Sequence, residues 1–199
     1  MADPSYLAEG TLTEGEAWVA IETTTLGAKA VNIGFTSGTG TKNWSQYEHL
    51  VLISSTRTDT GSNTDYVRLM LNGPSVAASG TYDDQWMGVT NGTVGKGAST
   101  SSTQGFMGYT VGGNRPSDIF GGHMCVLYDI NSGKYKHWMS KGASVSEGEG
   151  YSDMWSGIFH SQDPITSLYV SCYPTGTAGL WEVGSTAWLF GVLPKMVTV

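Results

Sequence analysis

The residues best suited to metal chemistry are the four histidines, and their spacing does not favour a metal site. His49, His123, His137 and His160 never occur as a close pair, and no cysteine stands at a zinc-ligand spacing from any of them. Three of the four fall in apolar runs that we interpret as strands, where a histidine is most simply a residue of the sheet. We therefore predict no metal site and no cofactor.

Paired carboxylates are the next groups that could carry chemistry, either as a general acid and base or as calcium ligands. The pairs that fall in predicted loops are Asp83 with Asp84, Asp59 with Asp65, and Glu147 with Glu149. Oxygen ligands in loops suit calcium, but the spacing of an EF-hand is absent. A carboxylate pair of the glycosidase type cannot be recognised from one sequence. We interpret these carboxylates as solvated loop charges.

Nucleotide-binding and acyl-transfer motifs fail when their spacing is checked. Residues 92–97 contain a Gly-Lys pair, but a phosphate-binding loop needs Gly five residues earlier and Ser or Thr afterwards, where Thr90 and Gly97 stand. No G-x-S-x-G sequence is present, and serine is too abundant for a catalytic triad to be argued. We expect no catalytic residue and predict that the protein is not an enzyme.

The two cysteines, Cys125 and Cys172, both lie in predicted strands. Two buried, reduced thiols are the simpler interpretation, because cysteine behaves as a small apolar residue in a core. A disulfide between them stays open as the alternative, although nothing in their spacing demands one.

The elements that position these residues are predicted to be strands. Glycine makes up 28 of 199 residues, about twice its usual share, and charged residues make up 14% against an average near 25%. Ser, Thr, Trp and Tyr are also abundant, and such a mixture is typical of many strands joined by tight turns. No window of helical periodicity with caps is long enough to predict a helix.

The chain contains apolar or alternating runs separated by turn residues. The clearest run is residues 184–192, where a Gly-Ser turn leads into a strand that Pro194 closes. Two alternating runs around residues 131–133 predict a hairpin. We expect loops and short strands of open order over residues 75–122, and an acidic loop over residues 142–150. Other strands are predicted near residues 17–21, 30–35, 47–55, 65–71, 151–159 and 165–173.

Regularly spaced short strands with turns between them predict an all-β fold. We expect a β-sandwich or jelly-roll-like single domain of roughly ten strands over residues 16–194, with an N-terminal arm over residues 1–15 and a short C-terminal tail over residues 195–199. A domain of this size buries about 70% of the surface of its unfolded chain, so it needs neither a disulfide nor a metal to fold.

Charge and hydropathy argue against nucleic acid and membranes as partners. The net charge of −7 argues against nucleic acid, because phosphate contacts need clustered Lys and Arg and the ten basic residues are scattered. No stretch approaches the eighteen or so apolar residues of a membrane helix, so we expect no membrane contact. The first residues show neither the basic nor the apolar region of a secretory signal.

Aromatic residues are the remaining candidates for a binding surface. Trp86, Trp155, Tyr82 and Tyr151 lie in or beside predicted loops. There they would form a sugar-stacking platform, subunit contacts, or covers for the ends of the sandwich, and we favour the last interpretation. The candidate interface residues are Tyr6, Leu7, Trp18, Trp86 and Trp155.

Several short segments also stand in a recognisable order. They are residues 23–27, 44–52, 67–73, 165–170 and 184–192. In these segments the chain resembles a family of small all-β virion structural proteins of tailed phages, including marine and cyanobacterial phages. Members show a Tyr-x-x-Leu-x-Leu strand, an Arg-x-Asn-Gly-like strand end, an Ile-Thr-Ser-Ile strand and a terminal Gly-Ser-x-x-x-Leu-Tyr-Gly-Ile.

The resemblance includes local departures from the motifs and has a limited extent. Phe190 and Val192 replace the Tyr and Ile of the last motif, and Leu71 stands before Asn-Gly where Phe is usual. These changes are conservative. The similarity covers the two ends of the domain better than residues 75–160, and its motifs are strand ends and turns.

The resemblance implies a β-sandwich or jelly-roll subunit of a phage particle with no catalytic residue to carry across. On that basis we expect a capsid decoration or cement subunit, made in the bacterial cytoplasm and carried on the capsid exterior or tail of the virion. Its expected partners are the major capsid protein or other virion proteins, and further copies of itself, with a trimer favoured. The alternative is a carbohydrate- or receptor-binding module of a tail fibre or capsid appendage, with a glycan as ligand.

Overall fold

The computed structural model describes residues 18–75, 77–146, 149–172 and 179–194, and these residues are almost entirely β. Twelve strands form two antiparallel sheets, of eight and four strands. The all-β sandwich is therefore confirmed, with twelve strands in place of roughly ten. The helical elements in the described ranges are two single-turn 3-10 helices, η1 (Gly40–Lys42) and η2 (Trp44–Gln46).

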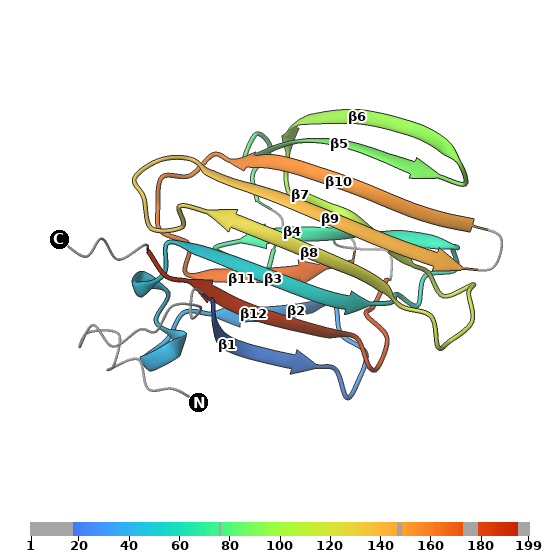
Figure 1. Cartoon of the computed structure of the whole chain (residues 1–199), viewed down its shortest axis with the longest axis horizontal. Helices are drawn as coiled ribbons and strands as arrows, with labels where there is room; N and C mark the ends of the chain where they lie inside the picture. The colour runs from blue at the N-terminus through green and yellow to red at the C-terminus, as the bar shows by residue number, and fades with distance from the viewer. Residues whose placement is uncertain (1–17, 76, 147–148, 173–178, 195–199) are drawn as a thin grey trace.

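The larger sheet contains eight strands and forms the front layer of the molecule in Figure 1, with β6 at the top and β1 at the bottom. The best-predicted strand, β12, lies inside this sheet and pairs with both β1 and β3. In spatial order the strands are β1 (Trp18–Thr25), β12 (Thr186–Val192), β3 (His49–Thr56), β8 (Gly121–Tyr128), β9 (Lys136–Ser146), β10 (Glu149–Phe159), β5 (Tyr82–Thr90) and β6 (Thr93–Ser102).

The smaller sheet lies behind the larger one (Figure 1). Its order is β2 (Asn32–Thr36), β11 (Ser167–Ser171), β4 (Thr64–Leu71) and β7 (Gly105–Val111). The edge strand β7 packs against β9 and β10 of the larger sheet. Strands β5 and β6 extend past β7, so the larger sheet overhangs the smaller one along one side.

The core lies between the two sheets and follows from alternation along the strands. Val67, Leu69 and Leu71 of β4 point into it, as the sequence pattern of residues 65–71 predicts. Leu50 and Leu52 of β3 face them from the larger sheet. Burying one such side chain contributes about 1.5–3 kcal/mol. The largest buried rings are those of Trp44, Trp138 and Trp181.

Two turns confirm local predictions. The hairpin around residues 131–133 is present and joins β8 to β9. Asn72 ends β4 in the left-handed region with φ at 58°, and its side-chain oxygen accepts a hydrogen bond from the Thr166 backbone N–H at 2.8 Å. Asparagine suits this position because its side chain tolerates that conformation and caps a neighbouring segment.

Two regions predicted to contain loops prove to be mostly strands. Within residues 75–122, β5 and β6 are long strands joined by the tight turn Asn91-Gly92, where both residues have positive φ. The predicted acidic loop over residues 142–150 is wrong, because β9 runs to residue 146 and β10 begins at residue 149. In both regions pairing with a neighbouring strand overrides weak local β-propensity.

Candidate interaction surface

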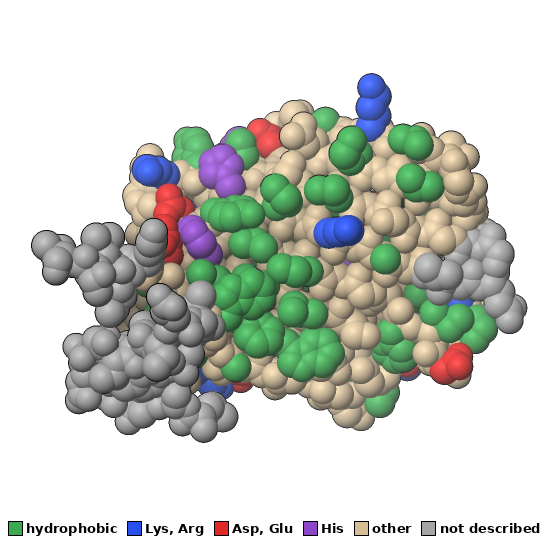
Figure 2. All heavy atoms as spheres, in the orientation of Figure 1, with side chains coloured by type: hydrophobic (Ala, Val, Ile, Leu, Met, Phe, Trp, Pro, Cys, Tyr) green, Lys and Arg blue, Asp and Glu red, His purple; other side chains and the backbone are tan. Residues whose placement is uncertain are grey.

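The outer face of the eight-stranded sheet carries most of the exposed apolar surface. We define it as the side chains that point away from the smaller sheet, alternating with those that point inward. Figure 2 looks onto this face and shows hydrophobic side chains spread across it, most densely over β12, β3 and β8. It holds eight of the eleven large apolar side chains that are exposed in the described ranges: Trp18, Met87, Val89, Val94, Met124, Tyr128, Met139 and Met154.

Methionines occupy the centre of the outer face. Met154 of β10 stands opposite Met87 of β5, and Met139 of β9 stands opposite Ser156. A shallow hollow of about 620 Å³ lies between them, lined in part by these three methionines. Methionine is flexible and polarizable, so it adapts to irregular partner surfaces. Exposed methionines on a sheet are therefore suited to contact with another protein.

The part of the outer face formed by β1 and β12 is aromatic. Trp18 of the edge strand β1 is 48% exposed, and its ring centroid lies 6.1 Å from that of Phe190 on β12. Trp188 also points outward. It stands opposite Ile53 on β3, and Ile53 in turn stands opposite Met124, a residue of the outer face. Trp18, named as an interface residue from the sequence, thus forms one end of this face. Tyr6 and Leu7 lie outside the described residues.

Two lysines interrupt the apolar surface. Lys141 of β9 stands between Met124 of β8 and Met154 of β10, and Lys96 of β6 stands opposite Met87. Neither lysine forms an ion pair with a carboxylate in the described ranges. The outer face is therefore apolar and locally positive, on a chain whose net charge is −7.

Trp86 and Trp155 lie on the opposite, inner face. Their rings are stacked with centroids 5.6 Å apart, and Phe106 of β7 stacks against Trp155 at 5.2 Å. The Arg68 guanidinium carbon lies 4.7 Å from the Phe106 centroid and extends the column. Trp86 is in the middle of β5, so its predicted loop position is wrong, whereas Trp155 is in the middle of β10, within the strand predicted over residues 151–159. The column fastens the overhanging hairpin β5–β6 and strand β10 to β7.

This column leaves little open ring surface. Trp155 is 4% exposed, and the Trp86 ring lies over Gly95 and Gly97 of β6. Of the three described interface candidates, only Trp18 reaches the outer face. The structure therefore does not bring Trp18, Trp86 and Trp155 into one shared surface.

Two carboxylates are buried on the inner face. Asp84 is 5% exposed, and neither of its oxygens has a hydrogen-bond partner among the described residues. Burial and, secondarily, the charge of Asp83 raise the pKa of Asp84 to about 7, while Arg68 opposes the shift. Burial also raises the pKa of Asp153 to about 6, although its carboxylate accepts a hydrogen bond from the Tyr109 N–H at 3.0 Å.

The spacing of these carboxylates does not suit glycoside hydrolysis. Asp84 stands opposite Gly157, and Gly157 lies four residues along β10 from Asp153. That separation is about 13 Å along the strand, whereas the acid and base of a glycosidase lie about 5–9.5 Å apart. Asp83 and Asp84 point to opposite faces of β5, so they are not joint ligands of one calcium ion.

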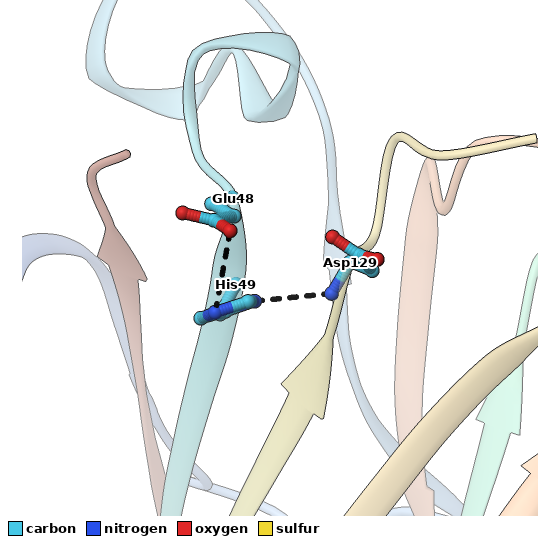
Figure 3. A group of neighbouring side chains, drawn as sticks. All are labelled: Glu48, His49 and Asp129. Carbon is cyan, nitrogen blue, oxygen red and sulfur yellow. Dashed lines mark hydrogen bonds and ion pairs between the residues drawn. The ribbon is translucent and has the colours of Figure 1, made fainter. Parts of the chain in front are cut away.

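One cluster in the described ranges brings three metal-ligating side chains together: Glu48, His49 and Asp129 (Figure 3). His49 Nδ1 accepts a hydrogen bond from the Asp129 backbone N–H at 3.0 Å, and Nε2 lies 3.8 Å from a Glu48 oxygen. Lys134 lies 3.9 Å from the Asp129 carboxylate and competes with any cation there. The cluster is best explained as a link between the end of β3 and the end of β8.

The remaining reactive groups are also buried. Cys125 and Cys172 are both buried and reduced, which confirms the simpler interpretation of the sequence. Burial raises the pKa of the Cys125 thiol, and the Cys172 thiol donates to the Gly179 carbonyl at 2.8 Å. His123 is buried as well, and burial lowers its pKa to about 4. These groups serve packing.

Sequence reasoning missed the outer face as a whole. The available signal is that residues 124–127 of β8 are apolar at every position, including those that alternate outward. A strand in a sheet with one wet face normally places a polar residue at every second position. A strand with two apolar faces needs a cover on both sides, and the smaller sheet covers one.

Comparison with protein-family models, curated proteins and solved structures finds no match for this chain. Within the described ranges, no helix has the length and hydrophobicity needed to cross a membrane.

Proposed function

We propose that the protein is a structural subunit of a tailed-phage particle, a capsid decoration subunit that binds the exterior of the head and stabilises it. The observation that carries this proposal is the outer face, where exposed apolar side chains gather on one side of one sheet. Soluble monomers rarely expose large contiguous apolar patches, and such patches mark contact sites. The resemblance of the five short segments to phage virion proteins supports a phage particle as the assembly that it joins.

The dimensions of the outer face suit a clamp across a subunit junction. Eight strands about 4.8 Å apart give a width of about 34 Å. A face this wide can contact two neighbouring capsid subunits at once. Many symmetric copies, each making a modest contact, would then resist head expansion together. The contact itself would draw on burial of the methionines and aromatic rings.

The proposal includes self-association into a homo-oligomer, with a trimer as the expected state. Binding of the outer face to the head leaves the smaller sheet and the edge strands β1 and β6 for contacts between copies. Unpaired edge strands are ready sites for such contacts. Light scattering coupled to size-exclusion chromatography gives the number of copies directly.

The test measures binding to purified heads that lack the protein. Replacing Met124 and Met139 by Asp places two charges at the centre of the outer face. We expect this double variant to fold but to bind heads at least ten-fold more weakly, and to lose the wild-type effect on the temperature of DNA release. The matched control is Val183→Asp, since Val183 is 52% exposed in a turn away from this face.

Two outcomes contradict the proposal. The first is that mass spectrometry of purified particles does not detect the protein. The second is that the double variant protects heads as well as wild type does, because the outer face would then not be the contact surface.

A further inference from the structure

Lys141 stands at the middle of the outer face. Its strand, β9, is the fifth of eight in the sheet, and its two cross-strand neighbours are methionines. The same cross-strand row continues through Met87 to Lys96 on the edge strand β6. The row therefore reads Met124, Lys141, Met154, Met87 and Lys96, and the backbones of the two lysines lie three strands apart, about 14 Å.

The position of Lys141 constrains what can cover it. An apolar partner that buried this lysine would remove its hydration, which is unfavourable unless an opposite charge replaces the water. A lysine near a rim can extend its ammonium group to solvent. Lys96 lies on the edge strand and can extend its ammonium group to solvent in this way. Lys141 cannot, because it is three strands from that edge. A partner that seals this face must therefore bring an acceptor to Lys141.

A second copy bound face to face is a poor occupant of this surface. The symmetry axis of such a dimer would pass through the middle of the face, between or near the central strands β8 and β9. The two copies of Lys141 would then approach each other in an interface whose centre carries no carboxylate, since the outward positions of β3, β8, β9 and β10 hold no Asp or Glu in the described ranges. Like charges juxtaposed in this way are unfavourable.

We propose that the partner of the outer face is a different protein surface, apolar and carrying a carboxylate placed to pair with Lys141, with a second acidic group facing Lys96. The methionines supply adaptable contact area, and the ion pair at Lys141 fixes the register of the complex. The inference rests on the proposed function in one respect, since it takes that surface to belong to the phage head.

The experiment compares Lys141→Glu, Lys141→Met and the control Lys134→Glu in binding to heads that lack the protein. Lys134 is exposed in the β8–β9 turn, away from the centre of the face. We expect Lys141→Glu to bind at least ten-fold more weakly and Lys134→Glu to bind like wild type. Wild-type binding should weaken between 50 and 500 mM salt, and Lys141→Met should lose most of that salt dependence.

Cross-linking identifies the acceptor. A carbodiimide, which joins an amine to a carboxylate in direct contact, should couple Lys141 to an acidic residue of a head protein. Lys141→Glu binding like wild type, or Lys141 cross-linking to a second copy of this chain, overturns the inference while head binding itself still stands. If wild type does not bind heads at all, the proposed function fails and the inference fails with it.

Discussion

The indole of Trp86 lies over Gly97, and a Cβ atom at that glycine would come within 2.5 Å of the indole Nε1. At Gly95, two residues earlier on β6, a Cβ atom would come within 2.8 Å of the far end of the same ring. The two glycines let β6 pass beneath a tryptophan of its partner strand. Glycine at these positions therefore serves close packing.

We expect Gly97→Ala to lower the free energy of unfolding by about 1–3 kcal/mol, because an added methyl group overpacks the contact with Trp86. Chemical denaturation measures the difference. The matched control is Gly122→Ala on β8, where an added Cβ meets nothing within 4 Å, and we expect a change within about 0.5 kcal/mol. Equal stability of both variants would show that Trp86 does not lie over β6.

Lys136 holds three loop carbonyls together and is fully buried. Its ammonium group donates to the carbonyl oxygens of Ser132, Lys134 and Gln162. Lys136→Met keeps the length of the side chain but leaves these acceptors without a donor, so we expect a loss of about 2–4 kcal/mol. Thermal unfolding measures it, with the exposed Lys134→Met as control. A melting temperature unchanged by Lys136→Met would refute the assigned role.

Asp84 gives the fold a predictable dependence on pH. Its folded-state pKa is raised to about 7 from an ordinary 3.8, mainly by burial. Between about pH 4 and pH 7 the folded state therefore binds this proton more tightly than the unfolded state does. Its contribution to stability is favourable at acidic pH and is lost as the pH rises through 7.

Asp84→Asn should remove this dependence. At pH 8 we expect the variant to be more stable than wild type by about 1–3 kcal/mol, since no buried charge remains. Near pH 4 the two proteins should be similar. Urea denaturation across this range measures the slope, with Asp118→Asn, whose side chain is exposed, as control. The expectation would be contradicted if the free energy of unfolding rose steadily from pH 4 to pH 8 in wild type and rose by the same amount in Asp84→Asn.

Arg57 organises the loop that joins β7 to β8. Its guanidinium donates to the carbonyl oxygens of Arg115 and Pro116, both at 2.6 Å, and to those of Gly113 and Ile119 at 3.2 and 3.5 Å. Arg57→Lys keeps the charge but loses the planar fork that reaches four acceptors. We expect faster amide hydrogen exchange over residues 113–119. Unchanged exchange there would mean that the loop holds its shape without Arg57.

The fold class and most strands can be predicted from the sequence because alternation is a local signal. Residues 65–71 show it clearly, and Val67, Leu69 and Leu71 do point into the core. The β5–β6 hairpin is harder, since its polar, small residues resemble a loop. Its local signal is Asn91-Gly92, an Asn-Gly pair with φ at 49° and 80° that suits a two-residue hairpin turn.

The outer face lies beyond local prediction because its members come from distant parts of the chain. Trp18 and Met139 share this face only because β12, β3 and β8 stand between their strands in a particular order. That order is set by pairings between segments far apart in the sequence, which no short window contains. The stacking of Trp86 on Trp155 could not be predicted for the same reason, since it depends on the pairing of β5 with β10.

The place of β12 in the larger sheet has a consequence for synthesis. The first described strand, β1, is an edge strand that pairs with β12. While the ribosome is still extending the chain, β1 has no native neighbour in this sheet until residues 186–192 emerge. Closing so long a loop is slow, and until then β1 is unpaired on both edges in this sheet and β3 has one open edge. The newly made chain is therefore most exposed to wrong pairing just before β12 arrives.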